Sequence, residues 1–167
     1  MTGTSVGGGA PAVKLRAAQP DDLTAIIQLL VDAGLPTAGI PADLERFIVA
    51  EHPGRLVGAA GLERYDRAGL LRSVVVALEA RSTGLGTALV ERILCDSAAD
   101  GVADVYLLTT TAERYFPRHG FKRVSRESVP AAVRASVEFR EACPATAAVM
   151  HRRLAAVRGL PEHGAVH

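Results

Sequence analysis

The chain has 167 residues, about half of them apolar, and a formal net charge of +1. This length suits a single domain with a sizeable core, while the near-zero charge, the few aromatic residues and the absence of tryptophan argue against a nucleic-acid partner. No apolar run approaches the ~18 residues of a membrane span, and Cys95 and Cys143 lack zinc-type spacing, so we expect no membrane and no metal, and reduced thiols in the cytoplasm.

The first part of the chain predicts a strand, a helix and an antiparallel meander. Residues 1–12 are rich in Gly and Ser/Thr, so we expect a disordered tail before a strand at 13–16. A helix begins around Gln19–Asp22 with acidic residues in its first turn, and Gly34 ends it. The elements expected next are a loop at 35–44, a short helix at 42–45, and strands at 47–50, 55–64 and 70–76.

The second part predicts a long crossover helix and further alternating elements. Apolar residues after Gly86 recur at helical spacing until Asp100-Gly101 closes the helix. A strand at 105–109 should therefore run parallel to strand 70–76. The remaining expected elements are a short helix at 112–119 capped by Thr110 or Thr111, a strand at 121–124, a helix at 131–141, a last strand at 147–154 and a flexible tail at 155–167. This order indicates one α/β (α+β) domain at 13–154.

A glycine loop joins strand 70–76 to the long helix. Unpaired amides at a helix N-terminus, beside the positive end of the helix dipole, suit a diphosphate. The loop lacks the Lys of a Walker A motif, and Leu89 replaces the third small residue of a Rossmann fingerprint. A helix start without a ligand is the alternative. The residues of this loop are Arg81, Ser82, Thr83, Gly84, Leu85, Gly86 and Thr87.

The pattern Arg-x-x-Gly-x-Gly after an apolar strand resembles the acetyl-coenzyme A loop of the GNAT N-acetyltransferases. The resemblance covers residues 13–154 and implies the GNAT fold, with helices on both faces of a mixed sheet of about six or seven strands that splay at the cofactor site. It also implies acetyl-CoA as the acetyl donor and residues 81–87 as its diphosphate loop. The strand edge at Val74, Val75 and Val76 would hold the pantetheine arm, with the Val75 amide polarising the thioester carbonyl.

A second stretch, from Leu107 to Phe121, resembles the other GNAT signature, in which a Tyr four residues before Gly-Phe protonates the leaving thiolate. Here Phe116 occupies that position and Tyr115 lies one residue earlier, about 100° away on a helix. Tyr115 is therefore a candidate acid, or else packs an adenosine or core face. The thiolate can also leave without an acid. The resemblance adds Thr110, Ala112, Tyr115 and Phe116 to the cofactor-binding residues.

Glu63 is the first candidate for the base that neutralises the acceptor amine, because strand alternation can point it into a cleft; the alternative is an exposed strand-end carboxylate. Arg72 interrupts an apolar strand, where an unpaired guanidinium is costly. It either pairs with Glu63 or binds an anionic substrate group, with Ser73 beside it. His119 is a weaker candidate base that could instead cap carbonyls.

Four segments together resemble the GNAT subgroup encoded in arsenic-resistance operons: Gly61–Glu63, Leu70–Ser73, Thr109–Ala112, and Glu138-Phe139 before Cys143-Pro144. That resemblance implies a small amino-acid-like acceptor bearing a phosphinic or arsinic acid. Protein amines are an alternative acceptor, and a sensor that binds acetyl-CoA without chemistry is an alternative class. A homodimer is left open.

Overall fold

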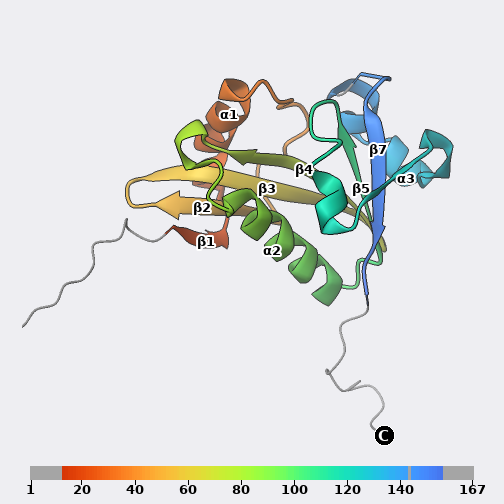
Figure 1. The fold of residues 1–167 in the computed structure, drawn as a ribbon, viewed down its shortest axis with the longest axis horizontal. Helices are drawn as coiled ribbons and strands as arrows, with labels where there is room; N and C mark the ends of the chain where they lie inside the picture. The colour runs from red at the N-terminus through yellow and green to blue at the C-terminus, as the bar shows by residue number, and fades with distance from the viewer. Residues whose placement is uncertain (1–12, 143, 156–167) are drawn as a thin grey trace, which may run out of the picture.

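A seven-stranded mixed sheet organises the fold, in the order β1-β2-β3-β4-β5-β7-β6 (Figure 1). It is seen in a computed structural model that describes residues 13–142 and 144–155; the tail expected at 1–12, the C-terminal tail beyond residue 155, and Cys143 lie outside the described residues. The strands are β1 (Lys14–Ala17), β2 (Phe47–His52), β3 (Arg55–Tyr65), β4 (Ala68–Val76), β5 (Asp104–Thr109), β6 (Lys122–Val124) and β7 (Ala148–Arg153).

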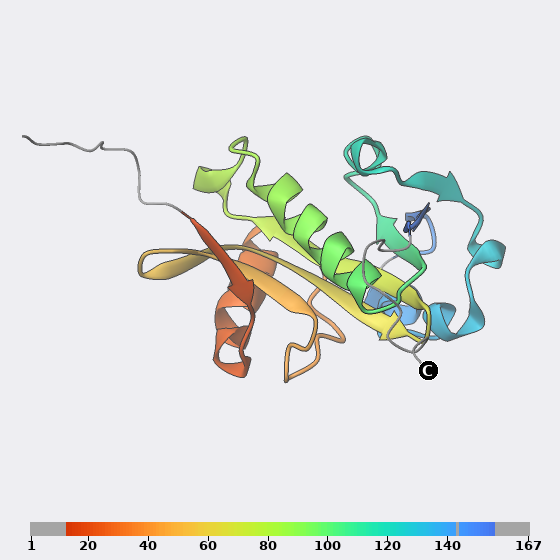
Figure 2. The same cartoon turned by 90° about the horizontal axis from the view of Figure 1, so that it is seen from below.

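Helices cover both faces of this sheet, as the sequence predicts (Figures 1 and 2). The α-helices are α1 (Leu23–Asp32), α2 (Leu85–Ala99) and α3 (Ala131–Arg134). The short helices are η1 (Pro20–Asp22), η2 (Leu78–Ala80), η3 (Phe116–His119), η4 (Arg126–Ser128) and the π-helical turn η5 (Glu138–Ala142). None of the helices in the described part of the chain combines the length and apolar character needed to cross a bilayer.

Three predicted helices differ from the structure. Residues 42–45 form turns, because Leu44 and Arg46 adopt left-handed φ values of 53° and 61°, which a right-handed helix excludes. The helix expected at 112–119 is reduced to the 3₁₀ helix η3, whose N-cap is Tyr115 and neither Thr110 nor Thr111. In the turn before it, the Thr109 hydroxyl accepts the amides of Thr111 and Ala112.

The third is the helix expected at 131–141, which breaks after α3 and resumes as η5. Between them the Ser136 hydroxyl accepts the Phe139 amide at 3.2 Å. Such local side-chain bonds compete with the helical ladder, and π-helical turns are frequent at functional sites. The break is what turns Glu138 inward, as the site described below shows.

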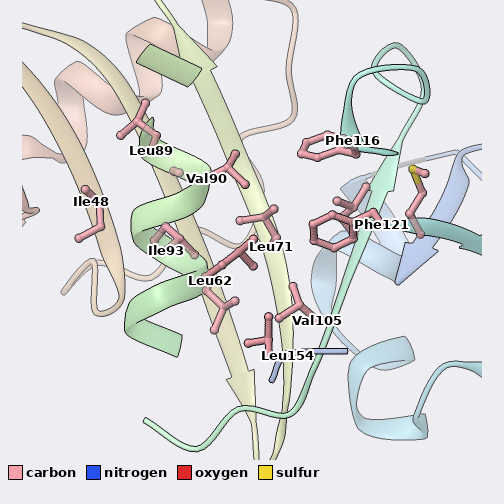
Figure 3. Packing of buried hydrophobic residues seen from close by; sticks show 14 of the residues in the cluster. Ile48, Leu62, Leu71, Leu89, Val90, Ile93, Val105, Phe116, Phe121 and Leu154 are labelled. Carbon is pink, nitrogen blue, oxygen red and sulfur yellow. The ribbon is translucent and has the colours of Figure 1, made fainter. Parts of the chain in front are cut away.

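The largest core lies between α2 and the sheet. Leu89, Val90 and Ile93 of α2 face Leu62 of β3 and Leu71 of β4 (Figure 3), and all five side chains are buried. Burial of each of these side chains stabilises the folded state by roughly 1.5–3 kcal/mol relative to leaving it exposed. On the opposite face, α1 packs through Ile26 and Leu30 against β2–β4. A third cluster, from Val129 to Phe139, covers β4, β5 and β7.

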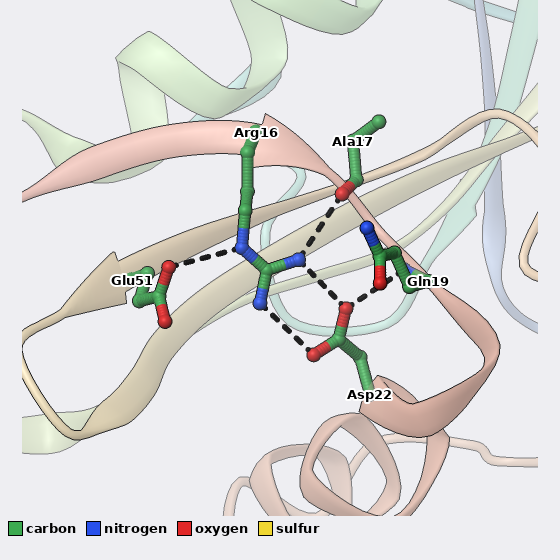
Figure 4. Close-up of polar contacts among 5 residues, drawn as sticks. All are labelled: Arg16, Ala17, Gln19, Asp22 and Glu51. Carbon is green, nitrogen blue, oxygen red and sulfur yellow. Dashed lines mark hydrogen bonds and ion pairs between the residues drawn. The ribbon is translucent and has the colours of Figure 1, made fainter.

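An ion-pair network ties β1 to the start of the first helical segment (Figure 4). Arg16 donates to Asp22 at 2.8 and 3.1 Å and to Glu51 of β2 at 3.0 Å. Asp22 also accepts the Gln19 amide at 2.8 Å. These bonds to the charged form, chiefly that from Arg16, hold the pKa of Asp22 below its ordinary value.

The sheet opens between its two parallel strands. β4 and β5 pair only where Ala68–Leu70 meets Asp104–Tyr106. Beyond Leu70 a β-bulge interrupts β4: Ser73 has φ 58°, and the register against β3 shifts between Ala59 and Gly61. The rest of β4 therefore diverges from β5, as expected of a sheet that splays.

Candidate functional site

A cavity of about 1060 Å³ fills the opening between β4 and β5. One wall is β4 from Leu71 to Val76, and the other is the segment from Leu107 to Ala112. The loop after β4 closes one part of the boundary, and the α1–β2 loop with Glu138 closes another. The cavity volume is in the range of small-molecule and cofactor sites.

The loop at 81–87 presents backbone at the N-terminus of α2. Gly84, at φ 85°, is the residue before the helix, and Ser82 also has a left-handed φ of 67°. The cavity lining includes Arg81, Ser82, Gly84, Gly86 and Thr87. Two predicted contact residues point elsewhere: the Thr83 hydroxyl donates to the Ala80 carbonyl, and the Leu85 side chain packs in the α2 core. Their backbone amides remain part of the loop that we expect to hold a diphosphate.

The strand predicted to hold the pantetheine arm lines the cavity. Val74, Val75 and Val76 all contribute to the wall, and Thr110 and Ala112 face them from the strand-loop opposite. Because β4 has no ladder partner on the β5 side after Leu70, main-chain groups that point to that side can bond a peptide-like ligand, except the Val76 carbonyl, which accepts from Arg81 Nε at 3.0 Å. That role for these residues stays a prediction.

Tyr115 belongs to a chain of hydrogen-bonded side chains at the α2 end of the cavity. Its hydroxyl lies 3.1 Å from His119 Nε2 and 3.4 Å from Thr87 Oγ1, and His119 Nδ1 lies 3.2 Å from Glu91. A Cβ on Gly86 would come within 3.3 Å of the same hydroxyl. The Tyr115 hydroxyl therefore sits beside the predicted diphosphate loop, and its role as acid to the thiolate stays a prediction.

Phe116 cannot supply a proton in its place. Its ring is buried and packs edge-on against Phe121, 5.7 Å between centroids. His119 is also buried and its two ring nitrogens face Tyr115 and Glu91, so it orients Tyr115. His119 does not line the cavity, which removes the geometric basis for treating it as the base.

Arg72 and Glu63 form an ion pair. This is one of the two alternatives that the sequence leaves open for Arg72, the other being contact with an anionic substrate group. Arg72 Nη1 donates to Glu63 Oε2 at 2.6 Å, Nη2 to the Ala38 carbonyl at 2.7 Å and Nε to Ser73 Oγ at 3.1 Å. The Arg72 side chain is wholly buried. Each of the three guanidinium nitrogens thus donates one hydrogen bond within the protein, and Arg72 fixes Ser73 and the Ala38 backbone. A contact of Arg72 with a substrate anion stays a prediction.

Glu63 does not line the cavity. One carboxylate oxygen accepts from Arg72 and the other from the Tyr65 hydroxyl. Burial and the Glu63 carboxylate raise the pKa of Tyr65 to about 12, so this hydroxyl keeps its proton. The β3–β4 ladder is regular from Gly61 to Glu63, so the alternation of β3 holds here. Glu63 differs from the expected base because Arg72 and Tyr65 engage both of its carboxylate oxygens.

The carboxylate that does line the cavity is Glu138, to which the sequence argument assigned no role. It is 5% exposed, and its Oε2 is a buried atom with no hydrogen-bond partner. Burial, opposed by Arg72 and reinforced by Glu63, raises the pKa of Glu138 to about 7. The predicted helix at 131–141 gave Glu138 no particular position, and the only available signal was the Glu138-Phe139 pair within the subgroup resemblance.

Comparison with known proteins supports one fold for this arrangement. The acetyltransferase (GNAT) domain model matches residues 43–123. Solved structures share the fold: N-acetylglutamate synthase from Neisseria gonorrhoeae, with coenzyme A and N-acetyl-glutamate, has a TM-score of 0.74 at 22% identity, covering 88% of this chain and 36% of that one. A Mycobacterium tuberculosis protein in complex with coenzyme A has a TM-score of 0.69 at 26% identity, covering 85% and 99%. The fold expected from the sequence is confirmed.

Among curated sequences, the chain is similar to amino-acid acetyltransferases. That of Ralstonia nicotianae is 29% identical over 125 residues, which is 70% of this chain and 28% of the relative. That of Pseudomonas fluorescens is 36% identical over 92 residues, 54% of this chain and 21% of the relative. The chain spans less than a third of the length of these two relatives.

Proposed function

Because the chain contains a GNAT N-acetyltransferase domain, we propose that it transfers acetyl from acetyl-CoA to the primary amine of a small amino-acid-like molecule. The observation that carries the proposal is the cavity between β4 and β5, which is lined both by the loop before α2 and by the buried Glu138. The amino-acid acetyltransferases among its relatives have acceptors of the same class by name.

On the donor side, residues 81–87 supply amides to the diphosphate at the start of α2. The β4 edge at Val74–Val76 aligns the pantetheine arm, and the Val75 amide stabilises the oxyanion of the tetrahedral intermediate. Bringing thioester and amine together supplies much of the rate, since effective molarities of ~10⁵ M or more are attainable. Thr110 and Ala112 form the opposite wall.

The acceptor lies at the Ser73–Glu138 part of the cavity in this proposal. The Ser73 hydroxyl accepts from Arg72 Nε, so its own proton is free to donate to an acceptor carboxylate or phosphinate. Arg72 then contributes indirectly by holding Ser73 in the bulge. This replaces the direct bidentate contact that the sequence left open for Arg72.

The finer acceptor class that we propose is an amino acid with a phosphinic or arsinic acid side group. Its support is that three of the four segments carrying the subgroup resemblance, at Arg72-Ser73, Thr109–Ala112 and Glu138, meet around the one cavity. A protein amine is the less favoured acceptor, because Glu138 and Arg72 are almost wholly buried.

The test is a coenzyme A release assay with a panel of acceptors: glutamate, glutamine, phosphinothricin, arsinothricin and an N-terminal peptide. The proposal expects amine-dependent thiol release and an N-acetylated product with an amino-acid-like acceptor, and far less with the peptide. Tight binding of acetyl-CoA, measured by calorimetry, without release for any amine would contradict the proposal and favour the sensor alternative.

A further inference from the structure

We infer that Glu138, rather than Glu63, takes the proton from the ammonium group of the acceptor. The inference rests on the acetyl transfer proposed above. A buried polar atom without a hydrogen-bond partner destabilises the folded state by roughly 1–3 kcal/mol of lost hydration, and such atoms are rare in folded proteins. Glu138 Oε2 is one of two such side-chain atoms in residues 13–142 and 144–155.

The position of Glu138 explains that cost. Its side chain borders the cavity from η5, opposite Arg72 and Ser73 of β4. An acceptor bound there would place its amine beside the Glu138 carboxyl group, whose buried Oε2 has no hydrogen-bond partner among the described residues. Glu63 offers no such oxygen, since Arg72 and Tyr65 occupy both. The geometry therefore favours Glu138 as the base and leaves Glu63 as the partner that holds Arg72.

The charges around Glu138 suit a group that must exchange a proton. Arg72 and Glu63 are the charged groups that act on it, and their charges offset each other as an ion pair. Tyr65 stays neutral. Burial thus dominates and keeps the pKa of Glu138 near 7, where a general base is most effective at neutral pH. An incoming ammonium would stabilise the carboxylate form before the proton moves.

The proton balance is complete with this one group. The Glu138 carboxylate removes one proton from the ammonium, and the neutral amine nitrogen bonds to the thioester carbon. The C–S bond then breaks, and the second amine proton passes to the thiolate, directly or through water. Glu138 returns its proton to solvent as products leave, so each turnover yields an amide, a thiol and one released proton.

Three structural contacts hold Glu138 in place. A Cβ on Gly39 would come within 2.9 Å of Val137 Cβ and 3.2 Å of Arg72 Nη1, so the α1–β2 loop packs directly against both. Ser136, next to Val137, caps the η5 turn through the Phe139 amide. Arg72 reaches the same loop through the Ala38 carbonyl. Arg72 and Glu63 are accordingly positioning residues.

The experiment compares kcat/KM from pH 5.5 to 9 for the wild type, Glu138→Gln, Glu138→Asp and Glu63→Gln, using the best acceptor of the panel. We expect an acid limb with an apparent pKa near 7 in the wild type. Glu138→Gln should lose this limb, and its kcat at pH 7.5 should be lower by about 10²-fold or more. The KM for acetyl-CoA should be unchanged. Glu138→Asp should recover part of the rate, and Glu63→Gln should keep the limb.

Infrared difference spectra provide a readout that does not depend on turnover. The wild type should show a protonated-carboxyl band at pH 5.5 that is missing in Glu138→Gln. As the pH is raised, this band should disappear with the same midpoint as the acid limb of kcat/KM. The inference is overturned if Glu138→Gln keeps both the limb and a rate within threefold of the wild type, or if Glu63→Gln alone loses the limb. A wild type inactive with every amine would instead overturn the proposed function.

Discussion

The two ends of the cavity are built in different ways. At the end expected to hold the diphosphate, the solvent-facing loop at 81–87 presents backbone amides, except that of Arg81, which donates to the Leu78 carbonyl. At the end proposed for the acceptor, the buried side chains of Arg72 and Glu138 and the half-buried Glu63 come from three separate elements. The first end depends on main-chain geometry and tolerates most side chains. The second depends on a few ionisable groups whose charges must be balanced, so substitutions there should have the larger effects.

The largest expected effect is that of Arg72→Met. Removing a wholly buried guanidinium leaves the Glu63 carboxylate, the Ser73 hydroxyl and the Ala38 carbonyl without their donor. The free energy of unfolding, measured in urea, should fall by about 3–5 kcal/mol. Arg123→Met is the matched control, because its pair with Glu113 is exposed and should cost less than about 1 kcal/mol. Equal losses in the two variants would remove the contrast between buried and exposed pairs.

Glu138→Gln should change how stability depends on pH. A raised carboxyl pKa means that the folded state keeps its proton between pH 4.5 and about 7 while the unfolded state releases it. The unfolding free energy of the wild type therefore falls as pH rises through that window, whereas the variant has no carboxyl group at this position and lacks that pH dependence. The difference in unfolding free energy, variant minus wild type, should grow by about 3 kcal/mol from pH 4 to pH 8. A difference that stays constant over that range would show that Glu138 titrates normally.

Gly84→Ala probes the backbone end. At φ 85° an alanine costs about 1–2 kcal/mol, although nothing lies within 4 Å of the new Cβ. Because the strain would reshape the loop amides, calorimetry should give a higher Kd for acetyl-CoA. Gly54→Ala has the same open surroundings at φ 91° in the β2–β3 turn, away from the cavity. Weakened acetyl-CoA binding in the Gly54 variant as well would attribute the effect to general destabilisation.

Asp22→Asn should have the smallest effect, since it lies outside both ends. The lowered pKa of Asp22 contributes stability above its unfolded value of 3.8, and this is lost as pH falls through the folded pKa. Thermal unfolding should show the variant less stable by about 1 kcal/mol at pH 7. The gap should close below pH 3. A gap that persists in acid would mean that packing, rather than the ion pair with Arg16, is responsible.

The same contrast explains what the sequence could predict. The diphosphate loop is local: Arg81 to Thr87 follow one another, and glycine positions report backbone conformation directly. The antiparallel meander and the parallel pairing of strand 105–109 with strand 70–76 follow from hydrophobic spacing and the crossover rule. The buried position of Glu138 lies beyond the break after Arg134, where the Ser136 hydroxyl accepts the Phe139 amide. The helix predicted at 131–141 runs through that break, so the sequence pattern could not place Glu138 at the cavity.

Glu63 shows a different limit. The alternation of β3 holds from Gly61 to Glu63, but a period-two pattern does not show that Arg72 and Tyr65 engage both carboxylate oxygens. The pairing of Arg72 with Glu63 is one of the two alternatives that the sequence leaves open, because an unpaired guanidinium in an apolar strand is costly. The sequence does not show that the Ala38 carbonyl, 34 residues away, accepts from the same guanidinium.

A crystal structure with coenzyme A and the N-acetylated product tests the two-ended cavity most directly. We expect the diphosphate on the amides of residues 81–87 and the product amide nitrogen within about 3.5 Å of Glu138 Oε2. A product that lies beside Glu63, or a diphosphate held away from the loop before α2, would contradict the account.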